Sequence, residues 1–104
     1  MESNWNFQGY IALPIERYGR KYIGESFPTA STIADGEFVD AMLQILLITY
    51  GDLKQVSDFV EQCNEYDGLS YNNIPQDVAI SLFRDFERLI REYEKREAKQ
   101  WRTK

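Results

Sequence analysis

The segment DGEFVDAMLQILLITYG, residues 35–51, decides the fold of this chain. After Ala41 it is apolar on nearly every side of a helix, which indicates a central helix covered by neighbouring elements. Asp35 precedes the run and predicts an N-cap, although Thr32 and Asp35 also have capping-box spacing and leave an earlier start open. Gly51 follows the last apolar residue, as a helix-ending glycine does. We therefore predict a helix at 35–50.

Two further helices are predicted on the C-terminal side. The helix at 53–66 follows Asp52, a predicted cap. Its apolar side is formed by Leu53, Val56, Phe59, Val60 and Cys63. The last helix, 74–101, begins at Asn73-Ile-Pro-Gln76, which combines an Asn cap with a proline in the first turn. Its apolar side is formed by Val78, Leu82, Phe86, Leu89 or Ile90, and Tyr93. The short connections predict antiparallel neighbours.

The first thirty residues have a different pattern, with spaced aromatic side chains. The alternation in Trp5-Asn6-Phe7 and in residues 11–15 favours strands, with a turn near Gly19 and a second strand at 21–26. The alternative is a short helix that begins at Pro14, because proline suits a first helical turn.

These elements together predict the fold class. We predict a mainly α fold, with α+β as the alternative. An N-terminal β-hairpin or extended aromatic segment, residues 1–30, packs on a three-helix core in a single globular domain, 1–104.

The totals fit a soluble globular protein. The chain has 104 residues, of which 43% are apolar and 14% aromatic, enough for one packed core and far from the composition of disordered chains. The N-terminal residues lack a basic stretch followed by an apolar one, and the longest apolar run is too short to span a membrane. We therefore expect a cytoplasmic protein.

The sequence offers little chemistry for catalysis. It contains no histidine and a single cysteine, Cys63, so the usual zinc, copper and haem sites have no ligands. Cys63 lies on an apolar helix side without a histidine to activate it, and we interpret it as a small buried residue. The spacing of Asp58, Glu61 and Glu65 is a weak metal signal and is more typical of a solvated helix face. We predict no enzyme, no metal and no cofactor.

Charge is distributed unevenly along the chain. The net charge is −5, but residues 25–77 hold ten acids against Lys54 alone, a balance of −9. The flanking segments, 1–24 and 78–104, have balances of +1 and +3. A surface dominated by carboxylates repels nucleic acid and anionic membranes and attracts basic protein surfaces. The other interpretation is that these acids solvate and cap two helices.

The candidate partner-binding residues are the acids without a capping role, together with three aromatic residues. Asp35 and Asp52 are set aside as caps. Tyr18 and Tyr22 are included because they neighbour Arg17 and Arg20, and Tyr, Trp and Arg are frequent interface anchors. Trp101 is a large apolar ring at the end of a charged helix that i,i+4 acid–base pairs support. The predicted set is Glu37, Asp40, Asp58, Glu61, Glu65, Asp67, Tyr18, Tyr22 and Trp101.

These properties favour binding over catalysis. In type, a small, acidic, histidine-free domain resembles bacterial immunity proteins and phage-encoded inhibitors, a resemblance that transfers no residue. We predict an acidic inhibitor or immunity-type protein that masks a basic site on a partner protein, without nucleic acid or membrane. The alternative is a structural or assembly subunit, for example in phage morphogenesis, that forms a homo-oligomer through its C-terminal helix.

Overall fold

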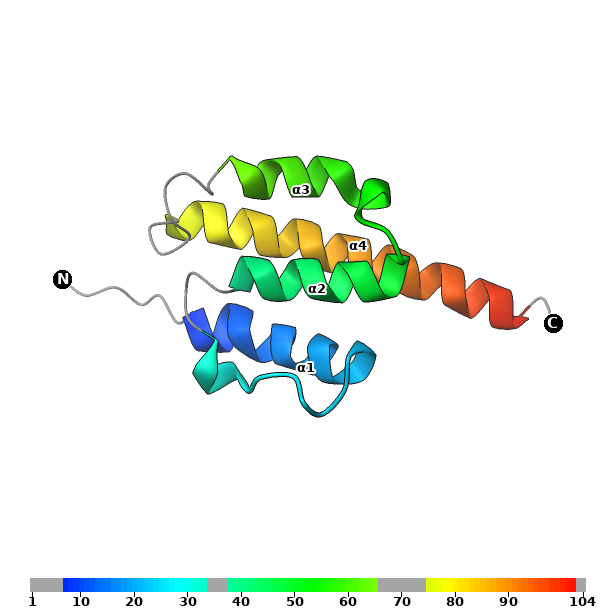
Figure 1. Ribbon diagram of the computed structural model, residues 1–104, viewed down its shortest axis with the longest axis horizontal. Helices are drawn as coiled ribbons and strands as arrows, with labels where there is room; N and C mark the ends of the chain where they lie inside the picture. Colours follow the sequence, from blue (N-terminus) through cyan, green and yellow to red (C-terminus); the bar gives the residue numbers. More distant parts are fainter. Residues whose placement is uncertain (1–6, 34–37, 66–74, 103–104) are drawn as a thin grey trace.

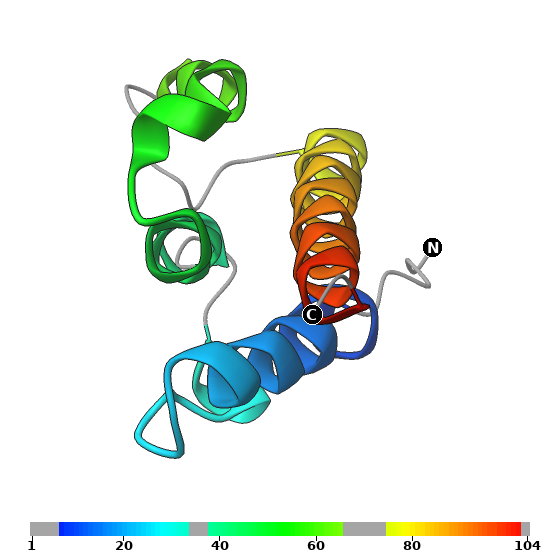
Figure 2. The ribbon, with the colours of Figure 1, turned by 90° about the vertical axis from the view of Figure 1, so that its right-hand side faces the viewer.

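The protein is built almost entirely from helices, which confirms the mainly α prediction. The computed structural model describes residues 7–33, 38–65 and 75–102, with side chains described as far as residue 98. Four α-helices lie in these ranges: α1 (Leu13–Tyr22), α2 (Phe38–Tyr50), α3 (Ser57–Asn64) and α4 (Gln76–Arg102). Three short helical turns accompany them: η1 (Gln8–Ala12), η2 (Ala30–Thr32) and η3 (Leu53–Val56). In the end-on view, α3, α2 and α1 form an arc, and α4 closes its open side (Figure 1, Figure 2).

The predicted hairpin at the N-terminus is wrong for the described residues. The π-helical turn Gln8–Ala12 continues directly into α1, and Pro14 lies in the first turn of that helix. Ile11 and Ile15 are buried one helical turn apart, whereas Leu13 between them is 47% exposed, so burial follows the helical period of 3.6 and not the strand period of two. The helical alternative was therefore the correct one, although the helical run begins before Pro14, and Trp5 lies outside the described residues.

Gly19 is part of the helix and forms no turn. It is buried, and a Cβ atom added there would collide with the ring of Phe27. The helix ends at Tyr22, and Gly24 follows with a φ of 133°, a backbone conformation that glycine adopts without strain. The segment predicted as a second strand, 21–26, therefore contains the last two residues of α1 and the turn that brings Phe27 back onto that helix.

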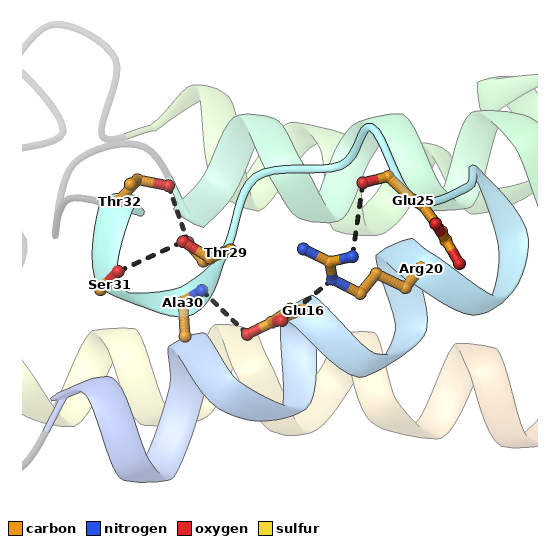
Figure 3. Close-up of polar contacts among 7 residues, drawn as sticks. All are labelled: Glu16, Arg20, Glu25, Thr29, Ala30, Ser31 and Thr32. Atoms are coloured by element: carbon orange, nitrogen blue, oxygen red, sulfur yellow. Dashed lines mark hydrogen bonds and ion pairs between the residues drawn. The ribbon is translucent and has the colours of Figure 1, made fainter.

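The connection between α1 and α2 is held on α1 by Glu16. Its carboxylate accepts hydrogen bonds from the Ala30 backbone N–H and from Arg20 Nε, both at 2.9 Å (Figure 3). Arg20 Nη1 also donates to the Glu25 carbonyl at 3.3 Å. Within η2 the Thr32 hydroxyl donates to the Thr29 carbonyl at 2.8 Å. Glu16 thus holds Ala30 on α1 directly and holds Glu25 through Arg20.

Helix α2 lies at the centre of the arc. Its buried side contains Phe38, Val39, Met42, Ile45 and Leu46, all at most 1% exposed. Gly51 ends the helix with a φ of 78°, and the side chain of Asp52 accepts a hydrogen bond from the Lys54 N–H at 2.8 Å. The predicted stop and the predicted Asp52 cap are confirmed, whereas the predicted Asp35 cap falls outside the described residues.

The long helix α4 packs its apolar side on the other three. Phe86 and Ile90 are fully buried and Leu89 is half-buried, so Ile90 is the inner residue of the two that the sequence left open. The Tyr18 ring of α1 contacts the Phe86 ring edge to face, with centroids 5.7 Å apart. The Tyr50 hydroxyl of α2 donates to the Leu89 carbonyl at 2.7 Å. Helix α4 continues past the end of α2 (Figure 1).

Candidate protein-binding face

Helix α3 and the residue that caps it carry a row of carboxylates, which we name the α3 row: Asp58 and Glu61 of the helix and Glu65 at its C-cap. All three are exposed. Their spacing of three and four residues places them on one side of the helix, about one turn apart. The opposite side of the same helix buries Phe59 and Cys63 in the core. The row is therefore fixed in position by the packing of the helix beneath it.

No cation within the described part of the chain neutralises the α3 row. The ion pairs found there are Glu16–Arg20, Glu94–Lys21, Glu92–Arg88 and Glu87–Arg91, which involve only α1 and α4. Helix α3 itself contains no basic residue.

Asp40 adds a fourth carboxylate from the neighbouring helix. It is exposed on α2, close enough to α3 that its charge acts on the Cys63 thiol. Burial, followed by the charge of Asp40, raises the pKa of Cys63 to about 12. The thiol therefore stays protonated at neutral pH, when a nucleophile would have to be a thiolate. The interpretation of Cys63 as a small buried residue is confirmed.

The solvent side of α2 also presents apolar surface. Leu47 and Ile48 are 46% and 56% exposed, although the sequence predicted cover on most sides of this helix. Asp40, Gln44 and Leu47 follow one another along that side at helical spacing. Exposed apolar side chains bordered by polar ones are typical of protein interfaces.

Tyr18 and Tyr22 point into the bundle. Tyr18 contacts Phe86, and the Tyr22 ring meets the Tyr93 ring edge to face, with centroids 5.8 Å apart. Both side chains are half-buried against the core. Their rings stabilise the contact between α1 and α4, and their role in partner binding stays a prediction.

Sequence reasoning missed the polar contact at this end of the bundle. Glu94 Oε2 accepts hydrogen bonds from the Tyr22 hydroxyl at 2.6 Å and from Lys21 Nζ at 3.0 Å. Partial burial alone would raise the pKa of Glu94, but these hydrogen bonds and the charges of Lys21 and Arg91 lower it below its usual value. Burial, followed by Glu94, raises the pKa of Tyr22 above its usual range. No local signal links residues more than seventy positions apart.

Comparison with protein-family models, curated proteins and solved structures gives no match to this chain. Function must therefore be argued from the surface of the chain itself.

The described residues supply no other kind of site. They contain no group of three or more Cys, Asp or Glu residues placed to hold a metal ion. None of the helices in the described ranges combines the length and apolarity needed to cross a bilayer. Of the remaining candidates, Glu37 and Asp67 lie outside the described residues. Trp101 belongs to α4, but its side chain is outside them as well.

Proposed function

We propose that the protein is a non-enzymatic binding module that uses the α3 row to bind a basic surface of a partner protein. The observation that supports this most strongly is that Asp58, Glu61 and Glu65 are exposed, aligned and without a cation in the described part of the chain. Aligned carboxylates attract a basic surface and orient its approach. On the neighbouring helix α2, Asp40 adds an exposed carboxylate, and Leu47 and Ile48 add exposed apolar surface.

The class of partner follows from the charge. A basic active site on another protein is a suitable target, because covering it with a carboxylate row blocks its anionic substrates. This is the mode of action of an acidic inhibitor or an immunity-type protein, and we propose that role in a bacterial or phage-infected cytoplasm. The proposal rests on the acids of α2 and α3 and not on Tyr18 or Tyr22, whose rings are engaged within the bundle.

Comparative capture from the native cell tests this proposal. Tagged wild type, Glu61→Lys/Glu65→Lys and the single variants Glu61→Lys and Glu25→Lys are purified in parallel. Glu25 is exposed on the α1–α2 connection and makes an equal change of charge away from the row. We expect a basic protein that elutes with wild type and Glu25→Lys, is weakened by Glu61→Lys, and is absent from the double variant.

The affinity for that protein is then measured over a range of salt concentrations. Removal of row contacts should reduce both the affinity and its salt dependence, because surface charges interact within a screening length of about 10 Å at 0.1 M salt. If wild type and Glu61→Lys/Glu65→Lys bind that protein with equal affinity and equal salt dependence, the proposal is contradicted.

The second candidate function is a structural or assembly subunit. It is favoured by one observation, the row of exposed cations on the outer side of α4.

A further inference from the structure

The solvent side of α4 carries four cations in line, which we name the α4 row: Arg84, Arg88, Arg91 and Lys95. All four are exposed, and their spacing of four, three and four residues keeps them on one side of the helix. Together with Glu87 and Glu92 they border a surface hollow of about 480 Å³.

The α4 row is only partly neutralised by its own helix. Arg88 Nη1 lies 3.4 Å from Glu92 Oε2, and Arg91 Nη2 lies 4.0 Å from Glu87 Oε2. The two Arg side chains remain 60% and 71% exposed. Arg84 and Lys95 form no ion pair with any residue that the structure describes. The two interleaved acids weaken the row as a site for a polyanion such as nucleic acid, and a short acidic helix fits it better.

The chain itself provides such a helix. Read from Glu65 back to Asp58, the α3 row has steps of four and then three residues. Read forward from Arg84, the α4 row has the same two steps. At 1.5 Å of rise per residue, these are about 6 Å and about 4.5 Å. Two antiparallel helices therefore bring each carboxylate opposite a cation, with Glu65 against Arg84, Glu61 against Arg88, and Asp58 against Arg91.

The two rows do not satisfy each other within one molecule. They lie on different helices and are directed to solvent, with α3 and α4 at separate corners of the bundle in the end-on view (Figure 2). Asp58 and Arg88 border one small hollow of about 180 Å³ between the helices. Even so, no ion pair joins α3 to α4 in the described ranges. Both rows are thus available to another molecule.

We propose that the α4 row of one molecule binds the α3 row of a second copy of this chain. The contact joins two different surfaces, so one copy can bind a second copy through its α3 row and a third through its α4 row. It is small, which makes the association weak and dependent on concentration. The inference depends on the proposed function only in using the same α3 row, and a foreign basic partner would compete with the second copy for it.

Reversed-charge variants test the contact. Sedimentation velocity is run from about 10 to about 500 µM, where small contacts become populated. The acid-reversed chain carries Asp58→Lys, Glu61→Lys and Glu65→Lys, and the base-reversed chain carries Arg84→Glu, Arg88→Glu and Arg91→Glu. We expect the average mass of the wild type to rise with concentration and each variant alone to stay monomeric. An equimolar mixture of the two variants should associate again, because each reversed row then meets a complementary one.

Two single-charge controls test whether the position of a charge on the surface matters for self-association. Arg17→Glu on α1 and Glu25→Lys change single exposed charges outside both rows, and both should associate as the wild type does. Circular dichroism establishes that each variant is folded. A wild type that is monomeric over the whole range, variants that associate unchanged, or folded variants whose mixture fails to associate would each overturn the inference.

The same variants separate this inference from the proposed function. The base-reversed chain should lose self-association and still capture the foreign partner. An acid-reversed chain that loses capture but keeps self-association contradicts the inference and leaves the proposed function standing. An acid-reversed chain that loses self-association but keeps capture contradicts the proposed function and leaves the inference standing.

Discussion

On α4, the carboxylates of Glu87, Glu92 and Glu94 each lie within 4.0 Å of a cationic side chain of the protein. The three carboxylates of the α3 row, by contrast, have no cationic side chain within that distance in the described ranges. The difference arises from the sequence of each helix. Helix α4 alternates acids with bases at i,i+4 spacing, and α1 supplies Lys21 to Glu94. Helix α3 has no base to offer. The carboxylates of Glu87, Glu92 and Glu94 thus form ion pairs that join parts of the fold, whereas no ion pair of the described chain offsets the charge of the α3 row.

The largest expected effect concerns the packing that holds both charged helices in place. Phe86 is fully buried and contacts the Tyr18 ring. Phe86→Ala removes that contact and leaves a cavity, which should lower the free energy of unfolding by about 3–5 kcal/mol. Urea denaturation followed by circular dichroism measures the change. A loss below about 1 kcal/mol would mean that α4 is not anchored at this point.

A smaller effect is expected from the paired carboxylate of α4. Glu94→Gln weakens two hydrogen bonds and removes the charge that faces Lys21, so the free energy of unfolding should fall by about 1–2 kcal/mol. Glu92→Gln is the matched control on the same helix, since it breaks only an exposed pair worth at most about 0.5 kcal/mol. Equal losses in the two variants would contradict the distinction between Glu94 and the exposed pairs of α4.

The contribution of Glu94 should also depend on pH. Its pKa is lowered in the folded protein, so the unfolded chain binds the proton more tightly. This contribution is complete above the unfolded pKa of about 4.3 and is lost as the pH falls through the lower, folded value. The difference in stability between wild type and Glu94→Gln should therefore be constant from about pH 7 to about pH 5.5 and then shrink on acidification. Denaturation curves at several pH values measure it, and a difference that grows toward acid would contradict the sign.

The smallest effect on stability is expected from the α3 row. Asp58→Asn/Glu61→Gln/Glu65→Gln removes three charges that form no ion pair in the described chain, so the free energy of unfolding should change by less than about 0.5 kcal/mol per site. Thermal and urea denaturation provide the measurement. A large loss of stability would show that the row supports the fold, and the contrast with α4 would disappear.

Local sequence rules predicted the parts of the fold that local chemistry controls. The stop at Gly51 and the cap at Asp52 depend on backbone geometry within a few residues, and both are present. The N-terminal segment was mispredicted because Ile11 to Ile15 satisfies a period of two over a window too short to exclude 3.6. Extending the window to Tyr18 and Tyr22 would have shown the helical period.

In the candidate site, too, the features that depend on local helix geometry could be predicted, and those that depend on distant residues could not. Exposure of Asp40, Asp58, Glu61 and Glu65 followed from helical spacing, because it requires only knowing which side of a helix is apolar. The inward direction of Tyr22 could not be predicted, since it depends on Glu94, a residue of a helix that packs beside α1 only in the folded chain.

The rate at which the buried Cys63 thiol is labelled can report local opening of the core. The side chain has no exposed surface, and its pKa of about 12 keeps it unreactive while the core is closed. Modification must therefore wait until a local opening of the core exposes the thiol, and the rate of labelling measures how often such openings occur. Because the α3 row is on the other side of that same helix, a molecule that binds the row and holds the helix in place would slow the labelling of Cys63 without contacting its sulfur.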